Sequence, residues 1–317
     1  MTLYLDTLLF TSNIVAPIFF IVFLGHLLIR LRVIDQGFVT TASRLVFTIT
    51  LPALVFMSIS RMDFKAVFNP VLLSYFIIGT LITFTLLWQI SKRFIHRPED
   101  LGVFIQGAFR GNYGIVGLAV SFNMFGDSGL AQASLLLACV IPLYNVLSVL
   151  ALSMPHQKSG FNLSKPLLEI ARNPLIIAVI LALPFSYYGW GLPIIGNKIG
   201  NYFANLTLPL ALLAIGGSLN LKSLRNTSGE SGWATLIKLI IMPLVLTGGA
   251  WLYGFRGQDI GILMVLFGCP TAAASFIMAK GMGGNAQLAA NIVLTTTLGS
   301  VLTLSGGIYL LRIWNVI

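Results

Sequence analysis

The sequence contains few charged residues and few acids. Only 9% of its 317 residues are charged and nine are acidic, whereas about a quarter of a typical soluble domain is charged. This scarcity argues against a soluble globular protein. It also argues against a pair of catalytic carboxylates embedded in the chain.

Motifs of catalysis, nucleotide binding and metal binding are also lacking. The chain contains no Walker A motif, no GxSxG and no HExxH sequence. Its two cysteines, Cys139 and Cys269, lie far apart within apolar runs, and no CxxC or Cys/His cluster accompanies them. We therefore expect no enzyme activity, no catalytic residue, no cofactor, no metal site and no ATP-driven pump.

The chain is instead rich in long apolar runs. It is 57% hydrophobic, with a mean hydropathy of +0.92, and runs of about 20 apolar residues, the length that crosses a bilayer, recur throughout. The first run follows MTLYLD, which has no Lys or Arg and so does not resemble a cleavable signal peptide. We predict an all-α integral membrane protein with ten transmembrane helices, over residues 8–30, 37–59, 68–91, 101–125, 129–153, 168–188, 196–220, 233–254, 258–280 and 285–312.

The net charge of +10 comes from basic residues scattered at the ends of these runs, which fits membrane topology better than nucleic-acid binding. By the positive-inside rule, the more basic side faces the cytoplasm. We predict a multi-pass protein of the inner (cytoplasmic) membrane with both termini on the extracytoplasmic side. The cytoplasmic loops would hold Arg30, Arg32, Lys92, Arg93, Arg97, Lys158, Lys165, Lys222, Arg225 and Lys280, and the opposite side Arg61, Lys65, Lys198, Arg256 and Arg312.

The two halves of the chain resemble each other. The segment TITLPALVFMSIS aligns with NLTLPLALLAIGG, so that Pro52 coincides with Pro209 at an offset of 157 residues, and the first and sixth and the fifth and tenth runs also align. The alternative is chance similarity among apolar segments. If the repeat is real, residues 1–155 and 156–317 each cross the membrane five times. The second unit is then inverted, which is typical of transporters.

Two runs contain corresponding helix-weakening residues. The fourth run contains FRGNYGIVG, with Gly111, Asn112 and Gly114, and the ninth contains LFGCP, with Gly268 and Pro270. Glycine weakens a helix, and proline removes a hydrogen bond from it. We predict that both helices break near the bilayer midplane, where such breaks line a binding cavity. The alternative is that the glycines allow close helix packing and the proline only kinks its helix.

Arg110 adds a permanent charge to the first break. A guanidinium near the bilayer centre costs at least about 2.5 kcal/mol and needs a partner or a wet cavity. The second break has no basic residue, so Arg110 would define an anionic substrate. The alternatives are that it snorkels to the interface or pairs with Asp127 or Glu169.

Other polar residues within the runs are weaker candidates. Thr271 and Ser275 lie one turn apart and could contact a substrate, or bond back to their own helix. Tyr144 and Asn145 could face the cavity or make a structural bond. Arg44 and Lys238 lie near the starts of the second and eighth runs, where both could snorkel, and neither is assigned to a site.

Three strings carry a family resemblance over essentially the whole chain: TLPALVF at 50–56, FRGNYGIVG at 109–117 and CPTAAASFIMA at 269–279. With the ten-run pattern, they resemble the auxin efflux carrier family, which includes bacterial members associated with malonate and malate. Its architecture is similar to that of bile acid sodium symporters, in which helices four and nine are broken and cross at the substrate site.

The resemblance implies a scaffold domain of helices 1, 2, 6 and 7 and a mobile transport domain of helices 3–5 and 8–10. Asn112 matches the asparagine of the first break and Pro270 the proline of the second. Plant carriers have proline after that asparagine, where this chain has Tyr113. They also have an aspartate in the third helix, and residues 71–88 here contain no acid.

We therefore predict a secondary active transporter of a small organic anion that works by alternating access. Alternatives are a sodium-coupled carrier like the bile acid symporters, a sensor that does not transport, and a passive channel. The coupling ion, proton or sodium, stays open, as does a homodimer, and the other expected partner is membrane lipid. The predicted substrate-binding residues are Arg110, Gly111, Asn112, Tyr113, Asn145, Pro270, Thr271 and Ser275.

Overall fold

The described part of the protein is helical. The computed structural model describes residues 2–153, 172–219, 221 and 229–317, and within these ranges the extended structure is limited to one isolated bridge. The helices are α1 (Thr2–Arg30), α2 (Gln36–Leu45), α3 (Leu51–Ser60), α4 (Phe64–Val67), α5 (Pro70–Ser91), α6 (Pro98–Phe109), α7 (Leu118–Ser153), α9 (Pro174–Tyr188), α10 (Ile194–Ser218), α11 (Gly229–Leu236), α12 (Met242–Tyr253), α13 (Gly257–Gly268), α14 (Ala274–Gly281) and α15 (Ala286–Ile313), with π-helical turns η1 (Val46–Thr50), η2 (Tyr113–Gly117) and η5 (Ile237–Ile241).

By length and composition, seven described helices or continuous helical runs are apolar enough to cross a membrane. They are 4–30, 36–60, 70–91, 113–153, 194–218, 229–253 and 286–313, and two shorter apolar helices are α9 and α13. The predicted helical fold is therefore observed in the described residues, and its long apolar helices are consistent with a membrane protein. The beginning of the predicted sixth run and the predicted boundary between the repeats at residues 155 and 156 lie outside the described residues.

The helices begin where the sequence provides capping residues. The side chains of Asn69, Asn173 and Asn285 accept hydrogen bonds from backbone N–H groups in the first turns of α5, α9 and α15. Pro70 and Pro174 follow the first two of these caps, at the position where a missing N–H removes no helical bond. Because these residues interrupt the apolar runs, the interruptions in the sequence coincide with helix starts.

The predicted fourth and fifth runs are joined in the structure. Helix α7 continues from residue 118 to residue 153, but Gly126 within it has φ 62° and ψ −148°, which is not helical. This kink lies between the predicted ends at 125 and 129. Glycine adopts positive φ without a steric penalty, so the chain turns at the start of the short polar interruption 126–128.

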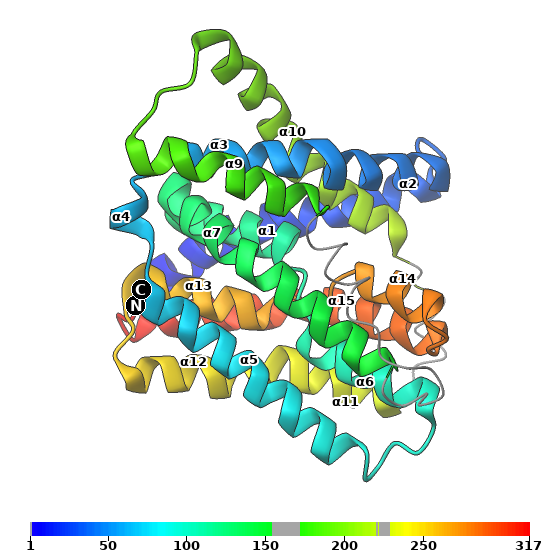
Figure 1. Ribbon diagram of the computed structural model, residues 1–317. Coiled ribbons are helices and arrows are strands. Elements are labelled where there is room, and N and C mark those ends of the chain that lie inside the picture. Colours follow the sequence, from blue (N-terminus) through cyan, green and yellow to red (C-terminus); the bar gives the residue numbers. More distant parts are fainter. Residues whose placement is uncertain (1, 154–171, 220, 222–228) are drawn as a thin grey trace.

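Helices α1, α3, α9 and α10 pack together, with α10 contacting both α1 and α3. Figure 1 places α3, α9 and α10 along the top of the view. The contact between α1 and α10 depends on small residues, because a Cβ atom at Gly216 would lie only 1.8 Å from the carbonyl oxygen of Val22. Backbones that approach this closely are typical of helix pairs in membranes.

A second group lies on the other side of α7 and contains α5, α6 and α11 to α15, with α5, α11 and α12 along the bottom of the view (Figure 1). Helix α15 also contacts α1. The guanidinium of Arg312, near the end of α15, lies 4.7 Å from the ring centre of Phe10 in α1. The first and last helices therefore meet at the same end of the molecule.

Candidate functional site

Two helices are interrupted in the middle of the molecule. After α6 ends, Arg110 is extended, with φ −79° and ψ 112°, and helical structure resumes with η2. After α13 ends, Cys269 is extended, with φ −66° and ψ 149°, and helical structure resumes with α14. The interruptions fall at the two predicted breaks.

The two interruptions cross each other as a short antiparallel pair centred on Gly111 and Thr271. We call this the crossover. It satisfies backbone groups that the breaks leave without helical partners, as the interior of a membrane requires. The flanking bonds are reciprocal: the N–H of Asn112 donates to the carbonyl of Pro270 (2.6 Å), and that of Ala272 donates to the carbonyl of Arg110 (3.3 Å).

Side chains of the second break hold the crossover together. The hydroxyl of Thr271 donates to the carbonyl of Gly107 at 2.7 Å, and the Thr271 N–H donates to the hydroxyl of Thr296 at 3.1 Å. Gly111 leaves no room for a side chain, because a Cβ atom there would lie 2.7 Å from Sγ of Cys269. Thr271 thus bonds neither to its own helix nor into open space, but across to the first break.

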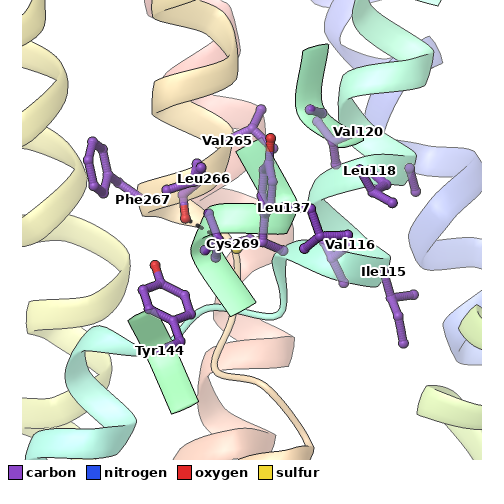
Figure 2. Packing of buried hydrophobic residues seen from close by; sticks show 14 of the residues in the cluster. Ile115, Val116, Leu118, Val120, Leu137, Tyr144, Val265, Leu266, Phe267 and Cys269 are labelled. Carbon is purple, nitrogen blue, oxygen red and sulfur yellow. Dashed lines mark hydrogen bonds between the residues drawn. The ribbon is translucent and has the colours of Figure 1, made fainter. Parts of the chain in front are cut away.

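Apolar side chains from both halves surround the crossover. Figure 2 shows Val116 and Leu118 on one side and Leu266, Phe267 and Cys269 on the other. The dashed line in that view marks the thiol of Cys269, which donates to the carbonyl of Leu266 at 3.4 Å. A polar group in this region is therefore shielded from water unless it reaches a cavity.

Arg110 is 9% exposed, and its partners within the described residues are neutral. Its Nη1 donates to the hydroxyl of Ser148 (3.0 Å) and to the sulfur of Met278 (2.7 Å), and its Nη2 donates to Oδ1 of Asn145 (2.9 Å). Such burial does not fit the alternative of snorkelling. Of its proposed carboxylate partners, Asp127 is not among these contacts, and Glu169 lies outside the described residues.

A cavity of about 740 Å³ adjoins the crossover. From the residues predicted for the site, its lining includes Arg110, Gly111, Asn112, Tyr113, Gly114 and Asn145. Both alternatives predicted for Asn145 therefore hold, because it bonds to Arg110 and also faces the cavity.

The remaining predicted residues lie away from the lining. Gly268, Pro270, Thr271 and Ser275 do not line this cavity. The hydroxyl of Ser275 and that of Tyr113 are buried, and neither has a hydrogen-bond partner within the described chain. Of these two residues, Tyr113 lines the cavity and Ser275 does not.

The prediction missed one polar wall of the cavity, which α2 provides through Gln36, Thr40, Ser43 and Arg44. Their spacing of three and four residues places them on one helical face, and this pattern could have identified them. Arg44 is exposed, as expected for a snorkelling residue, but it also faces the cavity.

The expectation for Lys238 is wrong. Its side chain is fully buried, and its Nζ donates to the carbonyl of Phe267 at 2.8 Å, just before the second break. The second half therefore does bring a cation to the crossover. It comes from a different helix, so inspection of the second break alone could not reveal it.

Comparison with known proteins agrees with this picture. Residues 10–308 match the family model described as membrane transport protein. The chain is 25% identical over 298 residues to an "Uncharacterized transporter" of Methanothermobacter thermautotrophicus, covering 93% of this chain and 96% of the relative. It is 24% identical over 315 residues to a "Putative malonate transporter" of Rhizobium meliloti, covering 95% and 96%. It is also 24% identical over 305 residues to "Uncharacterized transporter YfdV" of Escherichia coli, covering 94% and 96%. The chain therefore belongs to the membrane transport protein family, the auxin efflux carrier family that its motifs resemble.

Proposed function

We propose that this chain is a secondary active transporter that carries a small organic anion, a carboxylate, by alternating access. The observation that carries the proposal is the guanidinium of Arg110, which is nearly buried at the wall of the cavity and bonded to neutral groups. A buried cation without a compensating anion is costly. A carboxylate bound beside it offsets this cost through two parallel charge-assisted hydrogen bonds.

The other walls of the cavity favour a small substrate with an apolar part. Ile115, Leu137 and Val140 line it together with the polar residues of the first break. Small-molecule sites commonly combine apolar walls with a few placed polar groups. The relative from Rhizobium meliloti that is named for malonate, a small dicarboxylate, supports this substrate class. Asn112, Tyr113 and Asn145 would orient the carboxylate beside Arg110.

We also propose ten crossings arranged as two inverted five-helix repeats. Two matching contacts support the repeat. Asp100, the third residue of α6, accepts a hydrogen bond from the side chain of Asn285 at 2.7 Å, and Asp259, the third residue of α13, accepts one from Gln132 at 2.6 Å. The two acids are 159 residues apart (259 − 100), close to the sequence offset of 157, and each partner lies in the first four residues of the fifth run of the other half.

The position of the cavity supports a scaffold and a transport domain. One wall belongs to α2 and α10, in the proposed scaffold, and another to the crossover, in the proposed transport domain. Gln36, Thr40 and Ser218 are exposed at the end of the cavity near Arg30, the last residue of α1, and the loop after it, which contains Arg32. The positive-inside rule assigns that loop to the cytoplasm. We infer an inward-facing state, with both termini outside the cytoplasm.

Uptake into proteoliposomes tests the proposal. The purified protein would be screened with radiolabelled mono- and dicarboxylates, and with neutral and cationic compounds, under imposed proton or sodium gradients. We expect carboxylate uptake by the wild type. The Arg110→Gln variant should lower it about tenfold to a hundredfold, because hydrogen bonds to charged groups contribute about 1.5–3 kcal/mol.

The matched control is Arg61→Gln. Arg61 is exposed, bonds to Asn197 and Asn201, and does not line this cavity. Its removal should leave uptake unchanged. Full uptake by folded Arg110→Gln would refute the role of the charge, and a neutral or cationic substrate would refute the substrate class.

A further inference from the structure

Lys238 brings a second cation to the crossover. It lies in the π-helical turn η5 between α11 and α12, and its side chain is fully buried. A π-helical turn inserts one extra residue into a helix, and such turns are frequent at functional sites. Here the turn places the ammonium group at the end of α13, which is a different helix from the one that contains Lys238.

The acceptor of Lys238 is a carbonyl that the break sets free. In an uninterrupted helix, the carbonyl of Phe267 would accept from the N–H of Thr271, four residues later. That N–H donates instead to the hydroxyl of Thr296 at 3.1 Å. The Phe267 carbonyl accepts from Nζ of Lys238 at 2.8 Å. The ammonium thus replaces a helical hydrogen bond that the second break removes.

Nζ of Lys238 also lies near the first break. A Cβ atom at Gly111 would lie 3.3 Å from Nζ, and 3.4 Å from the carbonyl oxygen of Leu266. The ammonium is therefore close to the backbone of one break while bonded to the other. Arg110 directs its guanidinium elsewhere, toward α7 and α14. The two cations consequently serve different parts of the crossover.

The C-terminal end of a helix carries a partial negative charge on its free carbonyls. In carriers with broken helices, such carbonyls coordinate the coupling cation, and oxygen atoms are the ligands that hard cations prefer. In the described chain, Lys238 bonds to a carbonyl and to no carboxylate. A covalently attached ammonium group at this position interacts with the free carbonyl as a bound monovalent cation would.

We propose that Lys238 is a built-in cation of the crossover, which takes the place of a transported sodium ion and makes anion uptake independent of sodium. The inference rests on the proposed function for its transport measurement. It also predicts a stability effect that needs no substrate. The ammonium group occupies the place that a free cation would otherwise take. Its positive charge holds the end of α13 against Gly111.

Three forms of the protein test the proposal: wild type, Lys238→Ala and Lys238→Gln. Replacing sodium by choline should leave wild-type uptake unchanged. Both variants should lose about tenfold or more of the uptake, because both remove the buried positive charge and Lys238→Ala also leaves the Phe267 carbonyl without its hydrogen-bond donor. Added ammonium or sodium chloride should restore part of the uptake by Lys238→Ala, since truncation leaves space for a free cation. The exposed Lys280→Ala serves as the control and should not respond.

Thermal unfolding in detergent separates this proposal from the proposed function. Ammonium or sodium, compared with choline at equal ionic strength, should raise the melting temperature of Lys238→Ala but not that of Lys280→Ala. This result is expected whichever compound the protein carries. Sodium-dependent uptake by the wild type would overturn the proposal. So would full uptake by Lys238→Gln, which is the deciding variant if Lys238→Ala does not fold.

Discussion

The two breaks meet at one crossover but face different surroundings. The first break contributes Arg110, Gly111 and Asn112 to the wall of the cavity. In the second break, Cys269 and Thr271 are almost completely buried and bonded to other protein groups. The second break also reaches the cavity, through the apolar side chains of Ala272 and Ala273. The first break thus presents polar groups to a ligand, whereas the polar groups of the second break hold the crossing backbones in place.

The cations of the crossover differ in the same way. Arg110 touches the cavity and bonds to side chains, whereas Lys238 is enclosed and bonds to the backbone. Arginine has five N–H donors in a plane, which suits a carboxylate, and lysine is a compact point charge, which suits a carbonyl. The residue types therefore match the two surroundings. Substitutions can test whether recognition and support are separate.

The largest effect is expected where the breaks touch. Gly111→Ala would place a methyl group 2.7 Å from Sγ of Cys269, and overpacking of this kind costs about 1–3 kcal/mol. We expect a lower melting temperature of the purified protein and loss of carboxylate uptake. Gly114→Ala is the matched stability control, because its nearest contact is an ordinary 3.6 Å. Adding Cys269→Ala to Gly111→Ala should restore stability, and wild-type stability of Gly111→Ala alone would disprove the close contact.

A smaller effect is expected at the wall that holds Arg110. Asn145→Ala removes the acceptor of Nη2, which lies 2.9 Å away. We expect the KM for the transported carboxylate to rise about tenfold, since one such bond contributes about 1.5 kcal/mol. Asn123→Ala is the control in the same helix, because Asn123 bonds to the carbonyl of Ile14 and does not line the cavity. An unchanged KM in Asn145→Ala would mean that Arg110 needs no such support.

At Thr271 we expect an effect on the stability of the crossover but not on substrate binding. Thr271→Val removes the hydrogen bond to Gly107 but keeps the shape of the side chain. Hydrogen bonds between membrane helices contribute about 0.6 kcal/mol on average, so the melting temperature should fall by about 2 °C. Uptake measured over a range of substrate concentrations should give the wild-type KM. A raised KM at unchanged stability would instead place Thr271 in recognition.

The smallest effect is expected at Arg44, on the α2 wall. Its side chain is exposed, so its charge is screened by salt. Arg44→Gln should raise the KM about twofold at low ionic strength and leave it unchanged at high salt, as electrostatic attraction of an anion requires. The exposed Arg93, two residues after the end of α5, does not line the cavity, and Arg93→Gln should show no such difference. A salt-independent rise in Arg44→Gln would point to direct contact instead.

Much of the fold follows from local sequence. The apolar runs predict where helices cross, and Asn69, Asn173 and Asn285 mark where three of them begin. The kink at Gly126 is also local, because Gly126, Asp127 and Ser128 interrupt the apolar sequence between two predicted runs. The break positions were predictable for the same local reason, since glycine, asparagine and proline weaken a helix whatever surrounds it.

The sequence by itself determined that the chain is a helical membrane protein, where two helices break, and that one break carries a charge. Only the tertiary structure decided that Thr271 faces the other break, that Arg44 faces the cavity and that Lys238 is enclosed. The reason is physical. A membrane helix can be apolar all round, so its pattern does not say which face meets lipid, protein or a cavity. Those neighbours come from segments that are distant in the sequence, as the hydrogen bond between Lys238 and Phe267 illustrates.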